Sequence, residues 1–157
     1  MAQKKQDGFS MIGVIVAMYV TSVALIGILS LVATSLKLAE TSKMKLIASG
    51  LAQEAIEVVR DMRKAETEWD DWYADIVNGD YLVQYNSASL ISFLDDPLKI
   101  NGDGLYQYAT GTNSGFYRKV TLTKLSANEV KVLVEVKWQI KGNWNYLKVE
   151  DRLWNWK

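Results

Sequence analysis

The side chains that could do chemistry in this chain are carboxylates, amides and lysines, because it contains no cysteine and no histidine. Their absence excludes disulfides, thiol nucleophiles, Cys/His zinc sites and every Ser-His-Asp arrangement. One remaining cluster offers hard oxygen ligands for Ca²⁺, at Asp95, Asp96, Asn101 and Asp103. Their spacing matches no EF-hand loop, and Asp, Asn and Gly also gather in plain turns. Calcium is therefore an alternative to a simple turn here, and we expect no other cofactor.

The other polar features favour structure over catalysis. Asp70 and Asp71 could form an acid–base pair, but adjacent loop residues usually diverge and nothing pre-organises them, so we expect no enzyme. Residues 105–157 carry nine bases and four acids. Arg118 and the lysines that punctuate this block fit a solvated sheet face or edge protection, so we expect no nucleic-acid binding. The six Trp and eight Tyr fit core and sheet packing better than a carbohydrate or nucleic-acid platform.

The elements that must position these residues begin with an apolar segment over residues 9–36. The chain has 18 basic and 18 acidic residues, yet none of them lies in this segment. A helix of that length measures about 42 Å, which exceeds the ~30 Å hydrocarbon core of a bilayer. The hydrophobic part of a secretory signal is only about 7–15 residues long. The segment is therefore predicted to be a membrane span rather than a cleaved secretory signal.

The helical pattern continues through residues 37–64. Apolar residues recur there at spacings of three or four, and polar residues fall on the opposite face. Arg60, Arg63 and Lys64 crowd the last turn, where cations complement the helix dipole. We expect one helix of about 56 residues, roughly 84 Å long, with an apolar first half and an amphipathic second half.

The start of the apolar run reads KKQDGFSMI, in which a short charged leader ends in Gly8 and an aromatic residue, Phe9, opens the helix. This junction resembles the class III signal of type IV pilins and pseudopilins. The resemblance implies that a prepilin peptidase removes residues 1–8 and methylates the new amino terminus at Phe9. The stretch from Leu25 to Arg63 further resembles minor pilins of the PilV and GspI kind. Related major pseudopilins hold calcium in a loop of the head.

One position departs from that family's pattern. The fifth residue after the expected cut is usually Glu, which is thought to attract the amino terminus of a neighbouring subunit, but here it is Gly13. No carboxylate therefore remains in the apolar run to neutralise a buried cation. In the family, subunits that lack this acid tend to be present in few copies or at the filament tip. The proline that kinks many pilins is also missing.

The remaining residues, 65–157, predict a β-rich head. Residues 66–80 read as a surface connection with aromatic anchors, and residues 86–115 are rich in turn residues. The predicted strands are Tyr81–Tyr85, Phe116–Leu125, Glu129–Ile140 and Trp144–Trp156, with a hairpin signal at Lys141-Gly142-Asn143. Strands joined this tightly form an antiparallel sheet, and the amphipathic half of the helix is the natural cover for its apolar face. The expected fold class is α+β, pilin-like.

Three hypotheses about function follow. The first is a non-enzymatic structural subunit, a minor pilin or pseudopilin of a type IV pilus or of a type II secretion-like pseudopilus. It implies a single-pass precursor in the cytoplasmic membrane with the head outside the cytoplasm, and later a cell-surface filament. Its partners would be membrane lipid, a prepilin peptidase, the pilus assembly platform and other subunits. The second is a permanently membrane-anchored extracytoplasmic binding or sensor module. The third and least favoured is an anchored hydrolase that uses carboxylates.

Overall fold

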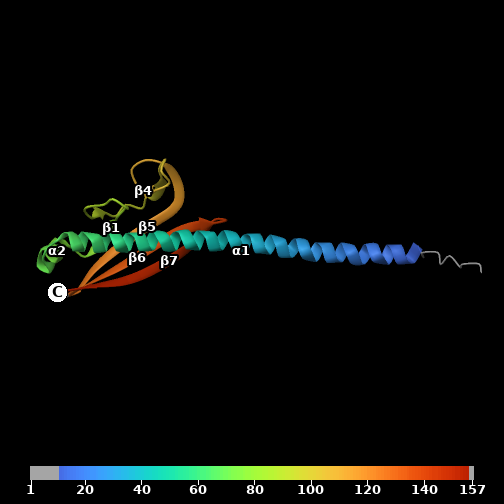
Figure 1. The fold of residues 1–157 in the computed structure, drawn as a ribbon, viewed down its shortest axis with the longest axis horizontal. Helices are drawn as coiled ribbons and strands as arrows, with labels where there is room; N and C mark the ends of the chain where they lie inside the picture. The colour runs from blue at the N-terminus through green and yellow to red at the C-terminus, as the bar shows by residue number, and fades with distance from the viewer. Residues whose placement is uncertain (1–10, 156–157) are drawn as a thin grey trace, which may run out of the picture. The chain divides into compact units, whose positions relative to one another are not determined.

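The computed structural model describes residues 11–155. Two helices come first, α1 (Met11–Ala65) and α2 (Trp69–Asp75). Seven strands follow: β1 (Gly79–Leu82), β2 (Ile91–Ser92), β3 (Pro97–Ile100), β4 (Tyr106–Gln107), β5 (Thr112–Ser126), β6 (Glu129–Ile140) and β7 (Asn143–Trp154). The chain divides into two compact units between Ser42 and Lys43, and each unit is described by itself. The fold is α+β, as the sequence predicts (Figure 1).

The first element, α1, is a single helix of 55 residues. It contains no proline, and its last turn carries Arg63 and Lys64 but no acid, as the helix dipole favours. The prediction of one long helix is confirmed over the described residues, with the carboxyl end one residue beyond the predicted one. By length and composition this helix is apolar enough to cross a membrane. The predicted start at Phe9 and the leader 1–8 lie outside the described residues.

The sheet is antiparallel, and its three long strands are consecutive in the chain. β6 pairs with β5 on one side and with β7 on the other, so that Val134 lies opposite both Val120 and Val149. β1 and β3 share the other edge of β5, and β2 and β4 extend the sheet beyond them. The β6–β7 hairpin turns at Lys141 and Gly142, whose φ angles of 52° and 83° are those of a type I′ turn.

The core of the second unit lies between the sheet and the carboxyl-terminal part of α1, which run side by side in Figure 1. The inward-facing valines of β6, from Val130 to Val136, are fully buried, and the alternation predicted for this strand is confirmed. The helix contributes a stripe of small and branched residues: Ala48, Leu51, Ala52, Ala55, Ile56, Val58 and Val59. Small residues such as Ala48 let a helix backbone approach a sheet closely. The predicted packing of the amphipathic half on the sheet is therefore confirmed.

The segments between α1 and β5 hold more regular structure than the sequence predicts. The predicted surface connection contains α2, whose Trp69 and Trp72 are buried anchors as expected. The turn-rich stretch 86–115 contains three short strands, β2, β3 and β4. Gly111 is required where β4 leads into β5, because its φ is 132° and a Cβ there would collide with the backbone of Ile100. The predicted strand Tyr81–Tyr85 is in fact β1, which begins and ends earlier, at Gly79 and Leu82.

Candidate functional site

The first candidate site is the surface of α1 in the amino-terminal unit. Every residue from 11 to 40 is exposed, and large apolar side chains such as Met11, Tyr19 and Leu31 are 84%, 71% and 68% exposed. The first buried residue of the helix is Ala48. Soluble proteins rarely leave so much contiguous apolar surface uncovered, so this segment requires an apolar environment of some kind.

Three of the hydroxyl groups within this segment are bonded to the helix itself. The hydroxyls of Thr21, Ser22 and Thr34 each donate a hydrogen bond to the carbonyl four residues earlier, at 2.7 to 3.0 Å. A hydroxyl that already has an acceptor is less costly to place in hydrocarbon or in a protein interior. As far as Leu36 the segment therefore presents a mostly apolar surface, with Tyr19, Ser30 and Ser35 as its other polar side chains.

The predicted assembly position, Gly13, lies in the first turn of α1. Apart from the neighbouring turns of the helix backbone, no atom of residues 11–155 would come within 4 Å of a Cβ at this position, and the same holds for Gly27. The backbone is helical, so a longer side chain would fit without strain. The predicted processing residues Gly8 and Phe9 lie outside the described residues.

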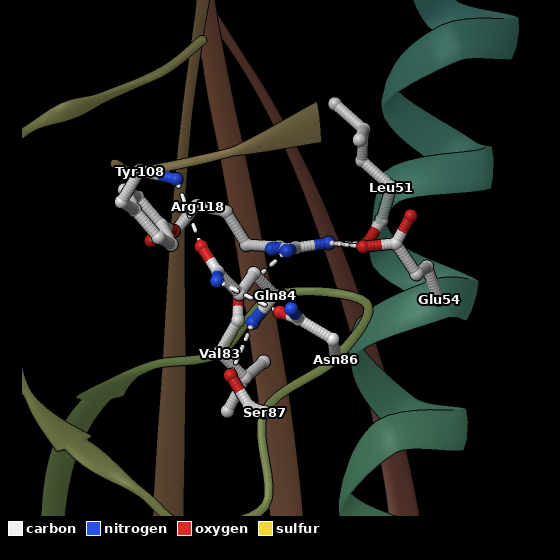
Figure 2. Close-up of polar contacts among 8 residues, drawn as sticks. All are labelled: Leu51, Glu54, Val83, Gln84, Asn86, Ser87, Tyr108 and Arg118. Carbon is white, nitrogen blue, oxygen red and sulfur yellow. Dashed lines mark hydrogen bonds and ion pairs between the residues drawn. The ribbon is translucent and has the colours of Figure 1, made fainter. Parts of the chain in front are cut away.

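The head is tied to the helix by a buried cation, Arg118 of β5, which is 1% exposed (Figure 2). One guanidinium nitrogen, Nη1, donates to the carbonyl of Leu51 at 2.8 Å and to Oε1 of Glu54 at 2.9 Å, both on α1. The other, Nη2, donates to the carbonyl of Val83, after β1, at 2.5 Å. A single side chain thereby joins the helix, the sheet and the loop that follows β1.

A second layer of polar contacts holds this loop in place (Figure 2). The side-chain carbonyl of Gln84 accepts a hydrogen bond from the backbone N–H of Tyr108, and the backbone N–H of Gln84 donates to Ser87, both at 2.9 Å. The hydroxyl of Tyr108 donates to the carbonyl of Arg118 at 3.2 Å. Burial raises the pKa of Tyr108, although the positive charge of Arg118 opposes this shift.

The prediction that Arg118 belongs to a solvated face or a protected edge is therefore wrong. Its position along β5 has the same parity as Phe116 and Val120, which face the core. This parity is the signal that could have identified it, because a charge on the inward face of a strand needs a buried partner. The outward-facing bases Lys119 and Lys137 do form exposed or half-exposed ion pairs, with Asp80 and Asp95.

The four candidate calcium ligands flank β3: Asp95 and Asp96 precede it, and Asn101 and Asp103 follow it. The carboxylate of Asp95 pairs with Lys137 at 2.8 Å. The side-chain oxygen of Asn101 accepts from the backbone N–H groups of Asp103 and Leu105, at 3.0 and 2.9 Å, as in an Asx turn. Among residues 11–155, no three His, Cys, Asp or Glu side chains are grouped as metal ligands would be. Asp96 has no role in these contacts, and calcium binding stays a prediction.

Comparison with known proteins adds no relative to this picture: no protein-family model, no curated protein and no solved structure matches the chain.

Proposed function

We propose that this chain is a non-enzymatic structural subunit of the pilin type, which is stored in the cytoplasmic membrane and assembled into a type IV pilus or a secretion pseudopilus. The observation that carries the proposal is the difference in burial between the two halves of α1. Residues 11–40 are all exposed and carry no charge as far as Leu36, whereas the buried stripe that begins at Ala48 belongs to the core of the head. The charged junction before Phe9, which resembles a prepilin signal, supports the same conclusion.

The apolar half of α1 would lie in two different environments in turn. In the precursor it lies in lipid, and in the filament it packs against equivalent helices of other subunits. This exchange replaces one apolar environment by another, so association has to come from close packing and polar contacts. Small residues such as Gly13, Ala17 and Gly27 permit that close approach, and Gly13 and Gly27 have open space beside them.

The experiment that tests the proposal is co-expression with a prepilin peptidase, followed by an intact-mass measurement of the purified chain. We expect loss of residues 1–8 and the gain of one methyl group on Phe9. Gly8→Val should block the cut, because the peptidase is expected to need Gly there. Gly13→Val is the matched control, since it makes the same change beyond the cut and should leave processing intact. Retention of Met1–Gly8 in the presence of an active peptidase would contradict the proposal.

One observation favours a second candidate, a permanently membrane-anchored extracytoplasmic binding module. Gly13 leaves the apolar run without any carboxylate, although pilins of this kind usually carry one for contact with a neighbour. A permanent anchor has no such neighbour and needs only an apolar helix. The same mass measurement separates the two candidates, because a permanent anchor would keep its first eight residues.

A further inference from the structure

One edge of the sheet is open along its whole length. β7 (Asn143–Trp154) pairs with β6 across all of its 12 residues, and no segment within residues 11–155 pairs with its other edge. Edge strands are usually short, or are interrupted by a proline or a bulge, since an open edge offers unpaired N–H and C=O groups to other chains. β7 has no proline, no glycine and no shift in its register.

The inner side of β7 is only partly covered. Leu147, Val149 and Leu153 are half-buried against the core, whereas the corresponding valines of the neighbouring strand β6 are fully buried. The cover provided by α1 therefore ends at β7. A further strand beside β7 would bring its own apolar side chains over this margin and would bury more of the three residues.

A basic pocket lies beside the carboxyl end of this open edge. Its volume is about 320 Å³, and it is lined by Arg60, Arg63 and Lys64 of α1 and by residues 151–154 of β7. Arg60 pairs with Asp151 at 3.0 Å, and Lys64 pairs with Asp61 at 3.1 Å.

Within residues 11–155, Arg63 has no carboxylate within ion-pair distance. Its guanidinium lies 5.3 Å from the ring centre of Trp69 and donates a hydrogen bond to the carbonyl of Glu66 at 3.3 Å. Among the described residues, the pocket thus holds a cation that has no acidic partner.

We propose that β7 accepts an extended acidic segment of a partner polypeptide as an additional strand of the sheet. Main-chain hydrogen bonds to the open edge would supply affinity, and the alternation of side chains would supply specificity. On the inner side, apolar residues of the partner cover Leu147 and Val149, and an acidic residue enters the pocket beside Arg63. The charge of the pocket selects an acidic segment over a basic one.

A second copy of this chain fits the open edge less well. Antiparallel pairing of two β7 strands would turn the α1 helix of the second copy to run in the opposite direction, because α1 and β7 lie along each other in the head (Figure 1). Two chains anchored in one membrane do not meet in that way. This argument rests on the proposed function, whereas the open edge and the basic pocket do not.

The test uses the full chain in detergent micelles and a short fluorescent peptide that alternates Val and Thr, with one Glu in place of the inward-facing Val that meets the pocket. Two further versions carry N-methyl groups on one or the other set of alternate residues, which removes the N–H donors from one edge of the added strand. We expect one N-methylated version to lose binding and the other to retain it. We also expect hydrogen exchange to slow along residues 143–154 when the unmodified peptide binds.

The contribution of the pocket is measured with Arg63→Gln, which should weaken binding of this Glu-bearing peptide about fivefold, as expected for a partly exposed ion pair. Lys45→Gln makes a comparable charge change at an exposed position of the same helix, remote from the pocket, and should leave binding unchanged. The same peptide with Lys in place of its Glu should bind more weakly than the acidic one. Equal binding of both N-methylated peptides, equal binding of the acidic and basic peptides, or binding of single-stranded DNA in place of any peptide would each overturn the proposal.

Discussion

Replacement of the buried cation by an apolar side chain of similar length, Arg118→Met, tests how the helix is held on the sheet. The substitution removes the donors to the carbonyls of Leu51 and Val83 and the ion pair with Glu54. Leu51 lies inside α1, where its carbonyl has a helical donor as well, so its loss is small. Val83 is fully buried, and its carbonyl loses the donor that Arg118 supplies.

The expected cost follows from these contacts. A buried carbonyl without a partner costs about 1–3 kcal/mol. The side chain of Glu54 is 31% exposed and turns to water once its partner is gone, so the lost ion pair contributes only about 1 kcal/mol. We therefore expect Arg118→Met to destabilise the head by about 3 kcal/mol. For a domain of this size that corresponds to a melting temperature about 10 °C lower.

The assay is thermal unfolding of the full chain in micelles, followed through the fluorescence of the buried Trp69, Trp72 and Trp138. Arg152→Met is the matched control, because Arg152 is half exposed and pairs with Glu129 and Glu150 on the surface. It should change the free energy of unfolding by less than about 1 kcal/mol. An Arg118→Met chain as stable as the unaltered one, as happens when apolar packing replaces a buried ion pair, would refute the reasoning.

Three further predictions concern assembly, folding and pH. Gly13→Glu should increase self-association or filament incorporation, as measured by cross-linking, and should leave processing intact. Gly13→Ala is the control, because it raises helix propensity without adding a carboxylate. Abundant homopolymeric filaments of the unaltered chain would contradict this prediction. A truncated chain that begins at Thr41 should be soluble and melt cooperatively. One that begins at Ala65 should aggregate, because the buried row from Val130 to Val136 becomes exposed. Equal solubility and equally cooperative melting of the two chains would show that α1 is not needed to cover the sheet. Burial raises the pKa of Tyr108, so the folded state resists its ionisation, and the free energy of unfolding should hold below about pH 10 and fall as the pH rises further. Urea unfolding at several pH values should show a weaker fall in this free energy for Tyr108→Phe. An unchanged fall would mean that another group causes the pH dependence.

The sequence predicts those elements whose pattern is set by local periodicity. The alternation in β6 and the three- and four-residue spacing in α1 both reflect one buried face, so strand, helix and their mutual packing could be derived. Arg118 could not, because charged residues on strands usually face water, and only its parity with Phe116 and Val120 marks it as inward.

The region before β5 was less predictable because its order comes from distant contacts. The side chain of Glu68, before α2, makes no capping hydrogen bond. The helix is instead held by the indole N–H of Trp69, which donates to the carbonyl of Ala127 at 2.7 Å, more than fifty residues further along the chain. β3 similarly depends on β5, where Ile100 lies opposite Thr112. Local turn residues give no sign of either partner.

The most direct test of the proposed function is to identify the amino-terminal residue of the chain recovered from the cell surface. The chain is expressed in a host with a type IV filament system, surface filaments are sheared off, and the amino-terminal peptide is identified by mass spectrometry. We expect the filament fraction to contain the chain beginning at methylated Phe9. A chain found only in the membrane fraction, with Met1–Gly8 still attached, would contradict the assignment as a filament subunit.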